Sequence, residues 1–390
     1  MIEDERKLIF LFEAVNSDDW VSIDCGNEDF LIDGSLVTWD TDDLYTDAGI
    51  NQKIRTNKDQ PLEILTTLRF FPSSKEQSCY KLPIYDQNLR YLVRSGFLYG
   101  NYDGLNQPPA FDFLLDGKKV STIEPASATE TIFDELVYTS KRSGFMNLCL
   151  AQRKDGGIPF ISSIQAIPTG DDLYANMKFN ETFRVVARIN YGNDDGSLSS
   201  SDDNYERIWT LGTTPPNCNA ISAIPDFESP ENDPPSFVLD SAIESVNASS
   251  PIILTVDFSN ASSASQSAYF VLYFTEEEAL FDDKNRTIDI FIDGQKLSTI
   301  TTSVERCTVV TLYPIIVRTP TVNVTLSAAN SSAGSPPLIT AMEVFVKVIP
   351  TGGASSLQFP FFSFILMLSS VFSDSSCLEF RVLVLKFELF

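Results

Sequence analysis

The sequence predicts an all-β protein built from two similar halves, and three observations support this. Short runs of alternating apolar and polar residues recur along the chain, separated by Gly, Pro, Asn and Asp, as is typical of β-sandwiches and barrels. The 3.6-residue periodicity of amphipathic helices is nearly absent. One thirteen-residue phrase also occurs in both halves. Four of the clearest predicted strands cover residues 90–100, 252–258, 268–274 and 343–349.

The repeated phrase predicts the same β-hairpin twice. It reads FDFLLDGKKVSTI at residues 111–123 and IDIFIDGQKLSTI at residues 288–300, with seven identical positions. Asp-Gly between alternating apolar residues favours a type I′ turn, because both central residues of that turn need positive φ. A two-residue turn would place Phe113 opposite Val120, and Ile290 opposite Leu297. Chance similarity of two hairpins is the alternative to a duplicated domain.

A second repeat favours duplication. The closing strand of each half ends in the letters IPTG, at residues 167–170 and again at residues 349–352. The hairpin and the closing strand therefore recur in the same order. We expect a lead-in, a first domain, an acidic Ser/Gly-rich connector, a second domain and a hydrophobic tail, over residues 1–19, 20–170, 171–206, 207–350 and 351–390.

Composition excludes several classes of function. The net charge of −25 disfavours binding to the phosphate backbone of nucleic acids. The chain has no histidine, which excludes the usual Ser-His-Asp and Cys-His nucleophiles and histidine-ligated metals. The acidic stretch at residues 190–209 does not match the ligand spacing of a calcium loop. We therefore expect no cofactor, no metal site and no enzymatic activity.

The six cysteines are widely spaced and form no CxxC motif. Some of them fit disulfides in an oxidising compartment, while Cys149 in MNLCLAQ also fits a buried thiol. The connectivity stays open at this point, because spacing alone does not determine it.

The two ends of the chain are less informative. The start, MIEDERKLIFLFEAV, does not read as a signal peptide, so we expect either a cytosolic protein or a sequence that lacks its first segment. The apolar run at residues 357–372 is shorter than the roughly twenty residues that span a bilayer. A membrane anchor there is the less favoured alternative to a divergent tail.

Several motifs together resemble one family. WVSIDCG (20–26), YTDAGIN (45–51), YLVRSGFLYGNYDGLNQPPAFDFLLDG (91–117), GGIPFISSIQAIP (156–168) and ERIW (206–209) occur in this order. The sequence resembles the malectin-like ectodomain of plant leucine-rich-repeat receptor-like kinases. This resemblance implies two tandem malectin-like, jelly-roll-like β-sandwiches related to carbohydrate-binding lectins. The repeats, membrane helix and kinase that follow in the family are missing, so we expect a truncated ectodomain.

The resemblance directs attention to loops that combine aromatic and polar side chains. Such loops suit saccharides, whose apolar faces stack on rings while polar groups orient the hydroxyls. The candidate carbohydrate-binding residues are Tyr99, Asn101, Tyr102, Asp103, Tyr45 and Asp47. The matching stretch of the second half, residues 271–283, is acidic instead, so we expect the sugar site in the first half and a scaffold or partner surface in the second.

We therefore expect a non-catalytic module that binds a cell-wall saccharide or glycan. The alternatives are a module that senses a peptide ligand or a co-receptor protein, and a fragment with no signalling role. The resemblance implies a cell-surface or extracellular, membrane-associated glycoprotein. Six Asn-x-Ser/Thr sequons would then be glycosylation sites: Asn180, Asn247, Asn260, Asn285, Asn323 and Asn330.

Overall fold

The protein is nearly all β-structure, as the sequence predicts. The computed structural model describes residues 20–55, 62–72, 77–85, 88–140, 143–170, 172–193, 203–224, 230–259, 265–277, 286–329 and 334–349. The lead-in at residues 1–19 and the tail at residues 351–390 lie outside the described residues. Within the described parts, no helix has the length and hydropathy needed to cross a membrane.

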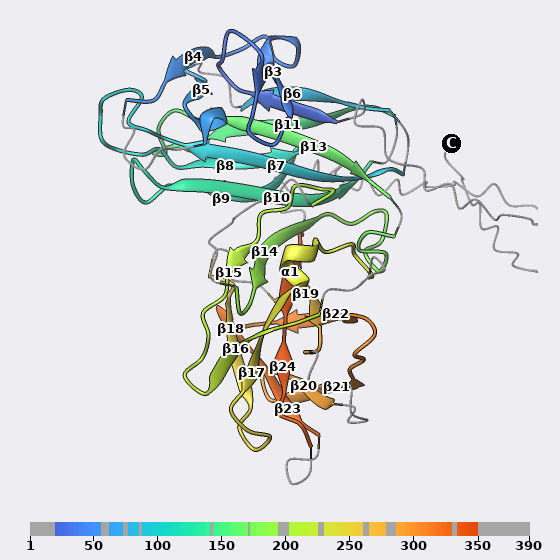
Figure 1. Cartoon of the computed structure of the whole chain (residues 1–390). Helices are drawn as coiled ribbons and strands as arrows, with labels where there is room; N and C mark the ends of the chain where they lie inside the picture. Colours follow the sequence, from blue (N-terminus) through green and yellow to red (C-terminus); the bar gives the residue numbers. More distant parts are fainter. Residues whose placement is uncertain are drawn as a thin grey trace, which may run out of the picture. The chain divides into compact units, whose positions relative to one another are not determined.

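The described residues of the first half form thirteen strands, labelled in Figure 1 where there is room. They are β1 (Val21–Asp24), β2 (Leu31–Ile32), β3 (Thr38–Thr41), β4 (Ile50–Lys53), β5 (Thr67–Phe70), β6 (Gln77–Ile84), β7 (Arg90–Leu98), β8 (Phe111–Leu115), β9 (Lys118–Ile123), β10 (Thr131–Thr139), β11 (Gly144–Gln152), β12 (Phe160–Ile161) and β13 (Ser163–Thr169). Two short 3₁₀ helices, η2 (Asp42–Leu44) and η3 (Glu63–Leu65), interrupt them.

In the second half, the described residues form the remaining strands and one helical turn. They are β14 (Phe183–Asn190), β15 (Thr210–Leu211), β16 (Cys218–Ser222), α1 (Ser236–Leu239), β17 (Ser241–Ser245), β18 (Ile252–Asp257), β19 (Gln266–Phe274), β20 (Thr287–Ile292), β21 (Gln295–Thr301), β22 (Thr308–Val317), β23 (Thr321–Ala328), β24 (Leu338–Ile339) and β25 (Ala341–Lys347).

The two halves repeat one sandwich. In the first, strands in the order β1-β13-β7-β10 belong to one sheet, and β6-β11-β8-β9 form another. In the second, β14-β25-β19-β22 and β18-β23-β20-β21 occur in the corresponding orders. Each half also has a small three-stranded sheet, β12-β5-β4 or β16-β17-β24. The matching strand orders confirm two tandem β-sandwiches and support duplication.

Each core lies between its two sheets, where alternate residues of the strands meet. In the first half, Phe97 of β7 contacts Phe113 of β8 with ring centroids 5.8 Å apart, and both rings are fully buried. In the second, Phe270 of β19 and Ile290 of β20 belong to one buried cluster. Period-two alternation in both facing sheets produces these dry interiors.

The repeated hairpins have the predicted turn but a different register. Asp116 and Asp293 have φ of 49° and 47°, and the glycines that follow them also have positive φ, as a type I′ turn requires. Phe113 pairs with Ser121, not with Val120, and Ile290 pairs with Ser298. Our predicted cross-strand pairs were therefore wrong by one residue, because a β-bulge follows the turn in both copies.

The predicted connector contains an ordered strand. β14 lies within residues 171–206 and pairs with β10 on one side and β25 on the other. One eleven-stranded sheet therefore includes strands of both halves. Since β14 occupies the position in the second sandwich that β1 occupies in the first, we propose that the second domain begins near residue 183 and not at residue 207.

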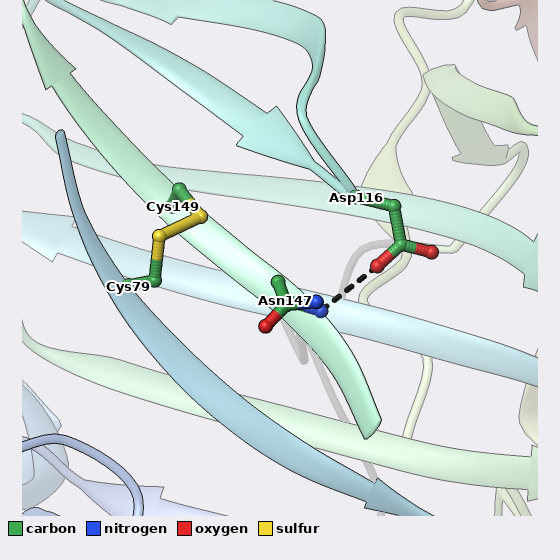
Figure 2. The surroundings of a disulfide bond; sticks show 4 residues. All are labelled: Cys79, Asp116, Asn147 and Cys149. Atoms are coloured by element: carbon green, nitrogen blue, oxygen red, sulfur yellow. Dashed lines mark hydrogen bonds between the residues drawn. A yellow bond between two sulfur atoms is a disulfide. The ribbon is translucent and has the colours of Figure 1, made fainter. Parts of the chain in front are cut away.

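A disulfide joins two neighbouring strands of the first half. Cys79 of β6 and Cys149 of β11 are paired directly across the sheet and bonded to each other, as Figure 2 shows. The reading of Cys149 as a buried free thiol was therefore wrong. Cys25 and Cys218 are buried thiols. Burial raises the pKa of the Cys25 thiol well above its usual range.

Candidate ligand-binding site

The structure brings Tyr99, Asn101, Tyr102 and Asp103 together in one turn after β7, but it buries both rings. Tyr99 is 0% exposed and Tyr102 is 3% exposed. Their ring centroids lie 5.5 Å apart, and the Tyr102 ring also contacts the ring of Phe160. No ring face of this turn is open for a sugar to stack on, so the stacking role that we expected was wrong.

The polar groups of this turn bond to one another. Asp103 Oδ1 accepts hydrogen bonds from the Tyr99 hydroxyl and from the amide of Leu105, and burial raises the pKa of Tyr99 to about 12. Asn101 Oδ1 accepts from the amide of Asn106 at 2.8 Å. A Cβ added to Gly100 would meet Ile54 Cβ at 2.3 Å, so Ile54 packs closely against the backbone of this turn. These contacts stabilise the turn.

The second predicted loop lies near η2. Tyr45 is half-buried against the first core and Asp47 is exposed. Among the described residues, no hydrogen bond or ring contact joins either side chain to the turn at residues 99–103. The six candidate residues therefore fall into two groups, which no such contact joins.

The predicted glycosylation sites divide into two groups. Asn180, Asn247 and Asn323 are exposed, so an attached glycan would meet solvent. The other three sequons, Asn260, Asn285 and Asn330, lie outside the described residues.

The structure reveals a cavity of ≈ 70 Å³ that the sequence did not indicate. Its apolar lining comes from Trp39, Leu62, Ile64, Phe133 and Ile208. Its polar lining comes from Asp33, Ser35, Arg94, Ser163, Gln165 and Glu206. We call it the outer-face cavity, because its strand residues point away from the first core.

Strand alternation explains this placement. On β7, Val93 and Phe97 face the core, and Arg94 therefore points to the opposite side. Arg94 is paired in register with Gln165 of β13 and with Glu135 of β10. The three side chains form a row across adjacent strands, in which Arg94 donates to Gln165 Oε1 at 3.0 Å and to Glu135 Oε2 at 2.9 Å.

Glu206 closes one side of the cavity. Gln165 donates from Nε2 to Glu206 Oε2 at 2.6 Å, which ties the turn before Arg207 to the sheet. Burial raises the pKa of Glu206, and the nearby Asp33 carboxylate acts in the same direction, while the hydrogen bond from Gln165 and the charge of Arg94 oppose both. Asp33, which also lines the cavity, accepts a hydrogen bond on Oδ2 at 2.8 Å from the indole of Trp39.

A buried ion network continues the row into the second half. Arg188 of β14 donates to Glu135 Oε1 at 2.6 Å and to Glu343 Oε2 at 2.7 Å. Burial alone would raise the pKa of Glu135, but Arg188 and Arg94 lower it to about 2. Tyr174 and Tyr273 both donate to Glu343. These contacts link the floor of the outer-face cavity to the second sandwich.

The chemistry of the cavity suits binding. Aromatic and aliphatic walls with a few converging polar groups are typical of ligand sites. No described cluster of three or more His, Cys, Asp or Glu side chains could hold a metal ion. Sequence reasoning missed the cavity because its residues are scattered from Asp33 to Ile208. The only sequence signal was ERIW, which we used as a family motif and not as part of a site.

Comparison with known proteins shows one consistent relationship. The family model described as "Malectin-like domain" matches residues 23–347. A probable leucine-rich repeat receptor-like protein kinase from Arabidopsis thaliana is 28% identical over 364 residues, which is 86% of this chain and 38% of that protein. An uncharacterised Arabidopsis thaliana protein is 28% identical over 345 residues, covering 86% of this chain and 66% of its own length. The chain thus spans less than two thirds of these relatives.

Solved structures show the same fold. The ANX2 ectodomain from Arabidopsis thaliana superposes with a TM-score of 0.70 at 16% identity, covering 84% of this chain and 96% of that one. The plant receptor-like kinase FER, solved in complex with the peptide RALF23 and LLG2, gives a TM-score of 0.67 at 17% identity, covering 84% and 95%.

Proposed function

Because the chain belongs to the malectin-like family, we propose that it is a non-catalytic recognition module of the kind found in receptor-like kinase ectodomains. The outer-face cavity carries this proposal, since it combines apolar walls with polar groups that can orient a ligand. The chain spans only 38% of the receptor-like kinase relative, so a role in signalling by a complete receptor is proposed here and not observed.

A peptide or a co-receptor protein is the ligand class that we favour. The structural neighbour FER was solved with a peptide and with LLG2, which supports this class by analogy. The small cavity also suits a single side chain better than a whole sugar ring. Recognition by one inserted side chain is common at protein interfaces, where a few buried anchors supply most of the affinity.

A saccharide is the second candidate. The Trp39 and Phe133 side chains lie beside the polar groups of Gln165 and Glu206, a combination that also suits the edge of a sugar. A saccharide bound at the outer-face cavity would not depend on stacking by Tyr99 and Tyr102.

We place the protein at the cell surface or in the extracellular space. The Cys79–Cys149 disulfide supports an oxidising compartment, where such bonds persist. The exposure of Asn180, Asn247 and Asn323 is compatible with glycosylation.

A binding screen tests the recognition function. The full chain is titrated with cell-wall oligosaccharides and with secreted-type peptides, and hydrogen exchange locates any protected backbone. We expect at least one class to bind and to protect residues 31–41 and 203–208. A folded protein that binds no member of either panel at millimolar concentration would contradict the proposal.

A further inference from the structure

We infer that the outer-face cavity selects a cationic side chain, an arginine or lysine presented by a peptide or protein ligand. This inference rests on the proposed recognition function and specifies the chemistry of its ligand.

The balance of charge around the cavity is the first argument. Three arginines nearby, of which Arg188 and Arg207 are buried and Arg94 is largely buried, are matched by three carboxylates, through the pairs Arg94–Glu135, Arg188–Glu343 and Arg207–Asp203. Asp33 and Glu206, which also line the cavity, form no salt bridge with any described residue. Arg94 also lines the cavity and acts on Glu206, but its salt bridge is to Glu135. Two carboxylates that form no salt bridge therefore face one small space, which favours a positively charged occupant.

Ser163 provides an independent argument. It is 3% exposed and lines the cavity, yet its hydroxyl makes no hydrogen bond with any residue that the structure describes. Its oxygen is not among the fully buried polar atoms that lack a partner, so it opens to the cavity and not to the packed core. A ligand N–H group in the cavity would provide the missing partner, since the hydroxyl oxygen can accept a hydrogen bond.

The backbone at Glu206 supports a functional role for its side chain. Glu206 has φ of +49°, in the left-handed region that a glutamate rarely adopts. Its amide donates to the carbonyl of Asp203, and Gln165 holds its side chain at the cavity. An unusual backbone conformation that directs a carboxylate to a cavity is typical of sites kept for function.

The small volume of the cavity and the exposed leucines beside it favour a side chain that belongs to a larger ligand. A volume of ≈ 70 Å³ corresponds to roughly five water positions, about the four heavy atoms of a guanidinium group. Leu62 at the cavity is 56% exposed, and Leu36, in the turn that carries Asp33 and Ser35, is 84% exposed. A peptide could cover these leucines with apolar residues beside its basic side chain, whereas a free cation could not.

A pair of matched probes tests the charge requirement. Nα-acetyl-arginine N-methylamide is titrated into the full chain by NMR, next to the citrulline compound, which has nearly the same shape and no charge. We expect the arginine probe to bind at least about tenfold more tightly, because hydrogen bonds between charged groups are roughly twice as strong as neutral ones. Equal binding of both probes, or binding of neither, would overturn the inference.

Substitutions of the cavity residues test whether the arginine probe binds in the outer-face cavity. Glu206→Gln and Asp33→Asn should each weaken binding of the arginine probe by about tenfold. Ser163→Val, which keeps both carboxylates and adds bulk, should also weaken it. Glu305→Gln, at an exposed glutamate of the second half, is the matched control and should leave binding within about twofold. If Glu206→Gln remains folded and binds the arginine probe as the wild type does, the cavity is not the cation site.

The screen described for the recognition function separates the two ideas. A peptide or saccharide that binds the wild type and Glu206→Gln equally well would leave recognition standing and remove the cation site. If a variant does not fold, the comparison of the two probes on wild-type protein still decides the inference.

Discussion

Two hydrogen bonds join Asp116, in the turn after β8, to Asn147 of the neighbouring strand β11. The Asp116 amide donates to the Asn147 carbonyl at 2.8 Å. The Asn147 amide donates to Asp116 Oδ1 at 3.0 Å, the bond drawn as a dashed line in Figure 2. Asp293 and Asn323 form the same two hydrogen bonds in the second half, both at 2.9 Å. The duplicated unit therefore includes the hairpin, its turn and its attachment to the neighbouring strand.

This reciprocal bond predicts a specific loss of stability. Asp116→Ala and Asp293→Ala should each lower the free energy of unfolding by about 1–3 kcal/mol, because each removes a charged acceptor and places alanine at positive φ. Asp116→Asn should lose less, since asparagine tolerates this conformation and keeps an acceptor. Urea unfolding measures the change, with Asp155→Ala at an exposed position as control. Equal losses for the Ala and Asn variants would argue against the reciprocal bond.

The ion network between the halves predicts a larger effect. Arg188→Met should lower the free energy of unfolding by about 3–5 kcal/mol, because Glu135 and Glu343 would keep their buried charges without this partner. The control is Lys296→Met, because the Lys296 side chain is 50% exposed in its pair with Asp289. This substitution should lower the free energy of unfolding by less than about 1 kcal/mol. Similar thermal unfolding of both variants would show that the network adds little.

Asp24 predicts how stability depends on pH. Burial raises its pKa to about 6, even though Thr67 and Asn27 donate hydrogen bonds to the carboxylate. The folded state therefore binds this proton more tightly than the unfolded chain, and the contribution of Asp24 to stability falls as pH rises from about 4 to 6. Relative to Asp24→Asn, the wild type should lose about 1–3 kcal/mol across that window.

Asp257 provides a contrast with the opposite sign. The Ser259 amide lowers the pKa of Asp257, so the wild type should gain stability over Asp257→Asn as pH rises through the acid range. Denaturant titrations between pH 3 and 7 compare the stability of the wild type with that of Asp24→Asn and with that of Asp257→Asn. A wild-type to Asp24→Asn difference that stays constant with pH would contradict the assignment of a raised pKa.

The two buried tyrosines predict opposite responses to loss of their hydroxyl groups. The Tyr102 hydroxyl is buried and has no hydrogen-bond partner among the described residues, so Tyr102→Phe should be neutral or stabilising by up to about 1 kcal/mol. Tyr99→Phe should destabilise by about 1 kcal/mol, because it loses the bond to Asp103. Thermal unfolding measures both. A greater loss for Tyr102→Phe would show that its hydroxyl has a partner in solution.

The sequence predicted the features that local patterns encode. The Asp-Gly turns follow from the need for positive φ, and the strands follow from alternation. The bulges at Val120 and Leu297 carry no local signal, because both residues fit an unbroken ladder equally well. The sequence did not predict β14 for a different reason. The acidic, Ser-rich residues that follow it gave residues 171–206 the composition of a linker.

The site was harder to predict than the fold. Tyr99 and Tyr102 sit beside polar loop residues, a pattern that suits both an exposed binding loop and a turn whose rings close the core. The outer-face cavity depends on Asp33, Arg94, Gln165 and Glu206, which only the register of four strands and one distant turn brings together. No spacing in a single sequence records such a relationship.

The pairing of β10 with β14 makes the two sandwiches protect each other from aggregation. Leu136 and Val137 pair with Arg184 and Phe183, so each sandwich covers a backbone edge of the other. An uncovered strand edge recruits strands of other molecules. Either half produced alone would present such an edge beside a buried charge that has lost one of its two partners, since Glu135 would keep Arg94 and Arg188 would keep Glu343. We therefore expect the two copies to fold as one cooperative unit.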